Sequence, residues 1–178
     1  MDIFIIIVQV SCLLLLALIF VYWLIAPIIS APFHPSSTKD VLEMFDLARL
    51  SRKDRFIDLG SGDGRAALAA SRVCEYAEGI EHNPFLTIFA RFMALISANG
   101  KLKFRNTSFW RVNVAKFDVV FVYLLPGQMK QLAGKLEEEA APGTRVVTNS
   151  FSIPGWKAVE ARNSGGKRYF LYELGKHK

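Results

Sequence analysis

The fold of this chain is indicated most clearly by residues 58–64, Asp58-Leu59-Gly60-Ser61-Gly62-Asp63-Gly64. Residues 55–59 have the apolar pattern of a buried strand, and residues 65–73 form an alanine-rich stretch that favours a helix. The three glycines therefore lie at a strand-to-helix turn, the context that a ligand-binding loop requires. Glycine lets the backbone turn tightly and approach a ligand without interference from a Cβ atom.

Outward from this turn, strand and helix patterns alternate. The predicted strands cover residues 55–59, 77–81, 102–105, 118–123 and 144–150, and the predicted helices cover 37–50, 65–73, 84 to Asn99-Gly100, and 128–140. Such alternation predicts a parallel sheet with helices on both faces. Segments 156–162 and 167–174 flank Asn163-Ser164-Gly165-Gly166, a hairpin signal that adds antiparallel strands at one edge. We therefore expect one α/β domain with a Rossmann-like sheet, from residue 39 to 178.

Acidic residues around the glycine turn indicate the cofactor. The spacing is GxGxG and follows Asp58, whose carboxylate can meet the ammonium group of S-adenosylmethionine directly or through water. Glu81 ends the next strand, where a carboxylate meets ribose hydroxyls, although nicotinamide-binding domains share that position and a solvated strand end is the alternative. The expected cofactor contacts on the turn and the second strand are Asp58, Gly60, Ser61, Gly62, Asp63, Gly64 and Glu81.

Three further polar residues complete the predicted cofactor site. His82 and Asn83 follow Glu81 and can edge the adenine, although such residues often simply begin the next helix. Ser108 follows the third strand, where many methyltransferases carry an aspartate that bonds the adenine amino group; an ordinary polar turn is the alternative. No Cys/His/Asp spacing supports a metal site.

The loop after the fourth strand, Tyr123-Leu124-Leu125-Pro126, is the predicted acceptor side, because ligands bind outside the carboxyl ends of such strands. The Asn/Asp-Pro-Pro-aromatic tetrad that orients planar nitrogens is absent. Tyr123 and Pro126 are compatible with a narrow channel for an aliphatic amine, and Tyr123 is our candidate for orienting it. The alternative is that Tyr123 only closes the strand.

The first thirty residues differ from the rest. Residues 3–29 contain no charged side chain and are long enough to cross a bilayer, so we expect a transmembrane helix over residues 1–30 and a linker over 31–38. A cleaved signal peptide is the alternative, but the basic n-region is missing. Basic residues follow the helix and none precedes it, which predicts a single-pass protein with its domain on the cytoplasmic or equivalent matrix side.

The chain is basic, with 22 Lys and Arg against 16 Asp and Glu, a formal charge of +6. Such a domain is attracted to anionic lipid headgroups. Because the cations are spread along the chain without a dense stripe, we expect no nucleic-acid partner. An ordinary solvated basic surface is the simplest interpretation.

Together these segments resemble the membrane-anchored protein lysine methyltransferases that act on the ATP synthase c-ring protein and on the adenine nucleotide translocase. Besides the apolar start and the glycine turn, the resemblance rests on Pro32-Phe33-x-Pro35-Ser36, Gly79-Ile80-Glu81, Asp118-Val119-Val120, Tyr123-Leu124-Leu125-Pro126 and Ser150-Phe151-x-Ile153-Pro154-Gly155-Trp156. It implies a class I methyltransferase of the seven-strand type with S-adenosylmethionine as cofactor. It also implies a lysine ε-amine acceptor on a protein that is embedded in or associated with a membrane.

Two other functions fit the same residues. A lipid headgroup amine methyltransferase would also need an anchor and a basic domain. A catalytically silent module could bind the cofactor and hold membrane complexes together, because cofactor-binding groups alone do not establish turnover.

Overall fold

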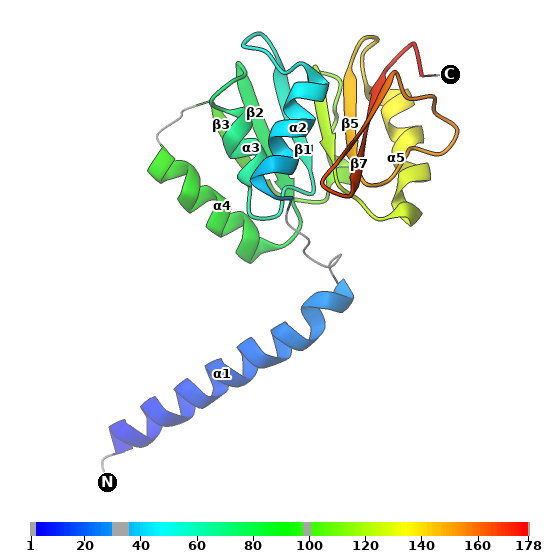
Figure 1. Cartoon of the computed structure of the whole chain (residues 1–178). Helices are drawn as coiled ribbons and strands as arrows, with labels where there is room; N and C mark the ends of the chain where they lie inside the picture. The colour runs from blue at the N-terminus through cyan, green and yellow to red at the C-terminus, as the bar shows by residue number, and fades with distance from the viewer. Residues whose placement is uncertain (1–2, 30–35, 98–100, 178) are drawn as a thin grey trace. The chain divides into compact units, whose positions relative to one another are not determined.

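The computed structural model describes residues 3–29, 36–97 and 101–177, with side chains described from 3 to 21, 36 to 96 and 101 to 177. The chain divides into two compact units, residues 1–34 and residues 35–178 (Figure 1). Linker residues 31–35 and the Asn99-Gly100 pair that we expected to close a helix lie outside the described residues.

The first unit contains helix α1 (Ile3–Ile29). Its large apolar side chains from Ile3 to Val21 are all at least 40% exposed. The stretch Ile3–Val21 is long and apolar enough to cross a membrane, judged by length and composition only. A helix that is apolar all round requires apolar surroundings on every side.

The second unit is built on a seven-stranded sheet with the order β3-β2-β1-β4-β5-β7-β6. Its strands are β1 (Arg55–Leu59), β2 (Tyr76–Glu81), β3 (Leu102–Asn106), β4 (Val119–Val122), β5 (Arg145–Asn149), β6 (Glu160–Ser164) and β7 (Lys167–Glu173). β1 to β5 are parallel, whereas β7 runs antiparallel to β5 and to β6. The predicted Rossmann-like sheet with an antiparallel terminal hairpin is confirmed. The strand order reverses between β1 and β4, and ligands in open α/β sheets bind at the strand ends beside such a point.

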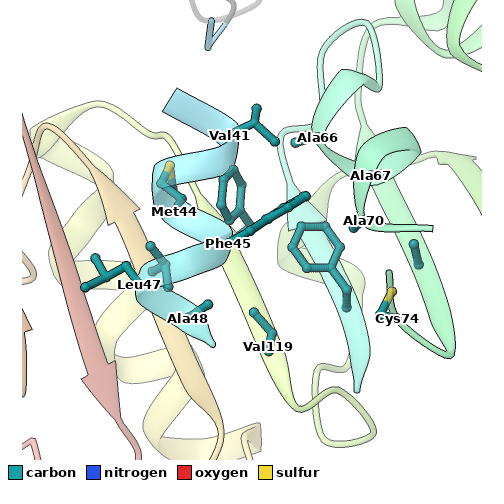
Figure 2. Packing of buried hydrophobic residues seen from close by; sticks show 14 of the residues in the cluster. Val41, Met44, Phe45, Leu47, Ala48, Ala66, Ala67, Ala70, Cys74 and Val119 are labelled. Atoms are coloured by element: carbon teal, nitrogen blue, oxygen red, sulfur yellow. The ribbon is translucent and has the colours of Figure 1, made fainter. Parts of the chain in front are cut away.

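Helices cover both faces of this sheet. Helices α2 (Thr38–Ala48), α3 (Arg65–Ala70) and α4 (Pro84–Ser97) share one core with it, and α5 (Pro126–Glu139) and the 3-10 helix η1 (Phe109–Arg111) lie on the other face. In the first core, Phe45 of α2 points at the sheet beside the small alanines of α3 (Figure 2). The Phe45 ring meets Phe56 edge-on, with 5.7 Å between centroids. These buried rings hold α2 and α3 over the strand that leads into the glycine turn.

Several element boundaries differ from the prediction (α3, for example, ends at Ala70 rather than 73), and two of these differences have a clear physical reason. The hairpin turns at Gly165-Gly166, whose φ angles of 59° and 77° are both left-handed, so β6 runs from Glu160 to Ser164 rather than from 156 to 162. Two left-handed residues make the tightest hairpin turn, which allows Ser164 to pair with Lys167. Helix α5 begins at Pro126 rather than 128, because the fixed φ of proline suits the first helical turn.

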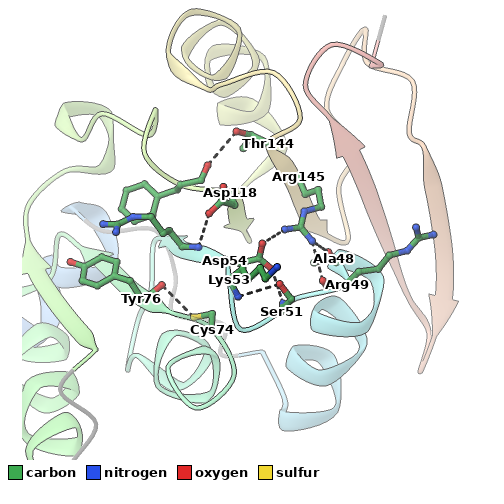
Figure 3. A network of polar contacts seen from close by, with 12 residues as sticks. Ala48, Arg49, Ser51, Lys53, Asp54, Cys74, Tyr76, Asp118, Thr144 and Arg145 are labelled. Atoms are coloured by element: carbon green, nitrogen blue, oxygen red, sulfur yellow. Dashed lines mark hydrogen bonds and ion pairs between the residues drawn. The ribbon is translucent and has the colours of Figure 1, made fainter.

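At the amino-terminal edge of the sheet, a polar network joins α2 to three strands (Figure 3). The Asp54 carboxylate pairs with the Arg145 guanidinium and accepts a hydrogen bond from the Ser51 amide at 2.6 Å. Arg145 also donates to the Ala48 carbonyl oxygen at 2.6 Å, and the Asp118 carboxylate accepts from the Arg55 amide at 2.8 Å. These bonds fix the positions of β1, β4 and β5 relative to one another where the strands begin. They therefore also fix how the carboxyl ends of these strands are aligned.

Candidate cofactor and acceptor site

The glycine turn leaves β1 and opens α3. Gly60, Gly62 and Gly64 have φ angles of 91°, 56° and 83°, which lie in the left-handed region that favours glycine. The amides of Gly60 and Ser61 both donate to the Ile80 carbonyl oxygen at 2.9 Å, so the turn is tied to the end of β2. This geometry confirms that the three predicted glycines form one strand-to-helix turn.

Close packing adds a second requirement for glycine. A Cβ atom at Gly64 would come within 2.5 Å of the Phe104 ring, and one at Gly79 would meet the same ring at 2.5 Å. Phe104 comes from β3 and is buried. The turn therefore lies directly against the ring, and neither glycine has room for a side chain.

Glu81 is held at the end of β2 by two backbone donors. Its carboxylate accepts from the Gly62 amide at 2.9 Å and from the Asn83 amide at 2.7 Å. The side chain is therefore oriented toward the turn, and its remaining lone pairs can accept from a ligand hydroxyl. Glu81 is a fixed part of the glycine turn and not a loosely solvated strand end.

Asp58, the last-but-one residue of β1, is only 6% exposed. Burial, together with the negative charges of Glu81 and Asp63, raises the pKa of its carboxyl group to about 8. Among the described residues, no hydrogen bond to this carboxyl group is found. Asp63 differs, since its carboxylate receives two hydrogen bonds of 3.0 Å from Nε of Arg65 and one of 2.6 Å from a terminal nitrogen.

The predicted adenine-side residues lie at the ends of β2 and β3. The Asn83 side chain accepts from the amides of Phe85 and Leu86, at 2.9 and 3.3 Å, so its carbonyl oxygen caps α4. His82 is exposed, and Ser108 is half-buried at the start of η1. Asn106, which sequence reasoning missed, donates from its side chain to the Glu81 and His82 carbonyl oxygens at 3.1 and 2.9 Å. It joins the two strand ends.

On the other side of the turn, Tyr123, Asn149 and Tyr169 come from or directly follow the adjacent strands β4, β5 and β7 and lie at the carboxyl-terminal ends of the parallel strands. Tyr123 directly follows the β4 residue Val122, which pairs with Leu59 and with Thr148. Asn149 follows Thr148 in β5 and pairs with Tyr169 of β7. Asn149 and Tyr169 are each 1% exposed, and Tyr123 is half-buried. Burial and the hydrogen bond to Asp40 raise the pKa of the Tyr169 phenol, and Tyr123 is close enough to add to that rise.

The first described residues of the domain lie at this edge as well. The carbonyl oxygen of Ser36 accepts from the Arg65 guanidinium at 3.0 Å, and its hydroxyl accepts from the side-chain amide of Asn149 at 3.4 Å. Tyr169 donates to Asp40 at 2.7 Å. Ser36, just before α2, thus contacts both Arg65 at the start of α3 and the end of β5, and Asp40 in the first turn of α2 holds Tyr169 of β7. Sequence spacing could not indicate these contacts.

These residues fit S-adenosylmethionine. Its ammonium and sulfonium groups are cationic, and carboxylates surround the turn, one of them buried and without a donor among the described residues. The carboxylate of Glu81 suits a diol, and the glycines leave the turn open to a close approach. When bound, the cofactor supplies a methyl group on a positively charged sulfur. In the described part of the chain, no group of three or more His, Cys, Asp or Glu side chains could hold a metal ion.

Comparisons with known proteins agree with this geometry. Residues 58–160 match the family described as the ANTKMT methyltransferase domain. The chain is 32% identical over 166 residues to a mouse lysine N-methyltransferase named for the C subunit of ATP synthase, covering 89% of this chain and 67% of the relative. It is 34% identical over 156 residues to a protein-lysine N-methyltransferase of Saccharolobus islandicus strain REY15A, covering 83% and 96%.

A solved structure is similar over the same region. It is an RNA methyltransferase from Salinibacter ruber in complex with S-adenosyl-L-homocysteine, with a TM-score of 0.78 and 29% identity, covering 82% of this chain and 96% of that one. S-adenosylhomocysteine is what remains of S-adenosylmethionine after methyl transfer, so the cofactor is S-adenosylmethionine. The chain belongs to the ANTKMT methyltransferase family and is an S-adenosylmethionine-dependent enzyme of the protein-lysine N-methyltransferase type.

Proposed function

We propose that this enzyme methylates a lysine ε-amine on a protein that is embedded in or associated with a membrane. One observation carries the proposal: the same chain contains the long apolar helix α1 and a lysine-methyltransferase domain. The mouse relative is named for the C subunit of ATP synthase, which supports an acceptor of this kind.

In the proposed cofactor site, Asp58 faces the ammonium group and Glu81 the ribose hydroxyls, with Gly60, Ser61, Gly62, Asp63 and Gly64 forming the floor. His82, Asn83 and Ser108 are assigned to the adenine side. The hydrogen bonds that orient Glu81 and the buried, negatively charged surroundings of Asp58 support the first two assignments. The Asp63–Arg65 pair gives Asp63 a positioning role for α3 beside any ligand contact.

The acceptor amine is assigned to the Tyr123–Pro126 side. A free lysine has a pKa of about 10.4 and must lose its proton before it can attack. Burial of the ammonium beside Tyr123 and Leu124 would disfavour its charged form, so no dedicated base is required. Tyr123 would accept or donate one hydrogen bond to orient the amine, and Pro126 would hold the mouth of the channel at the start of α5.

Membrane attachment through α1 is the second part of the proposal. Residues 3–29 carry no charge, whereas Lys39 and Arg49 follow them, so the positive-inside rule supports a cytoplasmic or matrix-side domain. An anchored enzyme meets its membrane-bound acceptors at a high local concentration.

The test uses the full chain, inserted into membrane vesicles and supplied with methyl-labelled cofactor. Label should be found as methyl-lysine in the protein fraction, and Glu81→Ala should abolish it while the exposed Glu138→Ala retains it. Introducing charges in α1, by Leu14→Lys with Leu15→Glu, should reduce labelling of membrane proteins. Label confined to lipid or to RNA would contradict the proposal, as would cofactor binding without transfer to any fraction.

A further inference from the structure

Helix α4 has an uncovered apolar face. Five large side chains form what we call the α4 stripe: Ile88, Phe89, Phe92, Leu95 and Ile96, which are 50% to 81% exposed. Their spacing of three or four residues places them on one side of the helix. Soluble proteins rarely leave so many adjacent large apolar side chains uncovered, and such a patch marks an interaction surface.

The opposite side of α4 faces the domain. Thr87 and Ala90 are each 1% exposed, and the helix packs against β3 and β2. In Figure 1, α4 flanks the β3 end of the sheet, and no other described element of the domain covers its outer side. The two most deeply buried residues of α4 are therefore small, and the exposed side chains of the stripe do not belong to the domain core.

The net positive charge of the chain comes from the sequence region that contains α4. Residues 82–117 contain no Asp or Glu and include six basic residues: Arg91, Lys101, Lys103, Arg105, Arg111 and Lys116. The remaining 142 residues hold 16 basic and 16 acidic side chains, so this stretch accounts for the whole formal charge of +6. Among the described residues, its ion pairs all go to the buried Glu78, from Arg105 at 3.2 Å and Lys116 at 3.7 Å.

We propose that the α4 stripe binds the surface of an anionic phospholipid bilayer, with its side chains among the upper acyl chains. The basic residues nearest to α4 in the fold, Arg91 in the helix itself and Lys101 and Lys103 at the start of β3, would lie at the headgroups. An apolar helix face bordered by cations is the pattern of helices that lie in a membrane interface. The proposal goes beyond the proposed function, because it adds a second membrane contact that requires neither α1 nor catalysis.

Bilayer docking also explains the place of α4 in the fold. The helix starts directly after Glu81, His82 and Asn83, and Asn83 caps it. Docking of α4 would therefore hold the edge that carries the cofactor residues close to the lipid surface, within reach of lysines near that surface. Nucleic acid fits less well, because phosphates would bind the cations but leave the apolar side chains in water. A second copy of the chain fits less well, because two such basic ends repel each other.

The experiment places a fluorescent probe on α4 of the full-length protein in nanodiscs whose lipids carry a quencher near the headgroup. In a Cys12→Ala background, Ile88→Cys is labelled on the stripe and Val159→Cys is the matched control. Ile88 is 63% and Val159 51% exposed, and Val159 precedes β6, at the opposite edge of the sheet from β3. Cys74 is buried and should not react. With anionic lipid, quenching at position 88 should exceed that at 159 several-fold.

Two further variants test the physical cause. Phe89→Ser with Phe92→Ser should remove the quenching at position 88, although α1 still holds the protein in the disc. Lys101→Gln with Lys103→Gln should weaken docking by about fivefold per charge, and neutral lipid should have a similar effect. Equal quenching at positions 88 and 159 would overturn the proposal. The proposal would also be overturned if the stripes of two copies of the chain contacted each other and position 88 were not quenched. Neither result depends on methyl transfer.

Discussion

A buried aspartate has opposite surroundings at the two ends of strand β1. The amino-terminal edge and the carboxyl-terminal edge of the sheet are the two sides at which the parallel strands begin and end. At the amino-terminal edge, Asp54 is 7% exposed and is paired with Arg145 and the Ser51 amide. At the carboxyl-terminal edge, four residues later, Asp58 is 6% exposed and has two other carboxylates as its electrostatic neighbours. The first carboxylate is satisfied by the protein itself. The second has no donor among the described residues, which supports its proposed role of binding the cationic cofactor.

This difference separates stability from binding within one strand. Removal of one partner from a buried ion pair is strongly destabilising, because the other charge is left unpaired. A buried carboxyl group among like charges costs stability when it is ionised. We therefore expect loss of a partner at the amino-terminal ends of the strands to destabilise the domain, and loss of the Asp58 charge at the carboxyl-terminal ends to stabilise it while weakening the proposed cofactor binding.

The largest expected effect is at the stable edge. Asp54→Ala leaves the Arg145 guanidinium without its carboxylate and should lower the free energy of unfolding by about 3 kcal/mol. Chemical unfolding of the full chain in detergent measures it. The control is Asp46→Ala, which removes an exposed ion pair with Arg162 and should cost under about 1 kcal/mol. Equal losses in the two variants would mean that the amino-terminal network is not a stabilising device.

At the other edge, the same kind of change should have the opposite sign. Asp58→Asn removes a carboxyl group that burial makes costly to ionise and should stabilise the cofactor-free protein by about 2 kcal/mol at pH 7. The gain is smaller than the full linkage value, because a buried amide also lacks partners. Cofactor affinity should fall in the same variant, as titration calorimetry would show. A loss of stability in Asp58→Asn would remove the contrast between the edges.

The pH dependence of cofactor affinity follows from the same contrast. The folded pKa of Asp58 lies above its unfolded value, so the folded protein holds the extra proton and loses stability as pH rises from about 4 to 8. A cationic ligand needs the ionised form, so affinity should rise about tenfold from pH 6 to pH 7. Binding assays at both values check this, and Asp58→Asn should show a flat profile. A flat profile in the wild type would contradict it.

The smallest effect concerns Asn106, which joins the ends of β2 and β3. Asn106→Ala removes hydrogen bonds to two backbone carbonyl groups and should cost about 1 kcal/mol of stability. It should also weaken cofactor binding a few-fold, because Glu81 loses part of its support. Asn113→Ala is the control, since Asn113 is exposed and its side chain accepts from the nearby Ala115 amide rather than joining two strands. Unchanged binding in Asn106→Ala would place that residue outside the site.

Much of this site could be predicted because parallel strands end at one edge. Asp58, the glycines and Glu81 come together for that reason, and Asn149 could have been found by the same rule. Tyr169 could not, because it comes from the beginning of an antiparallel strand. The pairing of Asp54 with Arg145 depends on how the beginnings of β1 and β5 are aligned in the sheet, and no local sequence pattern encodes that alignment. The net positive charge of residues 82–117 comes from the absence of Asp and Glu as much as from its six basic residues, so cation density alone does not indicate it.

The role of Asp58 is best tested by counting the protons released when the cofactor binds. Calorimetry at pH 6.5, in buffers with different ionisation enthalpies, gives this number for the full chain. We predict release of about one proton per bound cofactor in the wild type and close to none in Asp58→Asn. Absence of proton release in the wild type would show that Asp58 is already ionised before binding, and would contradict the contrast between the two edges.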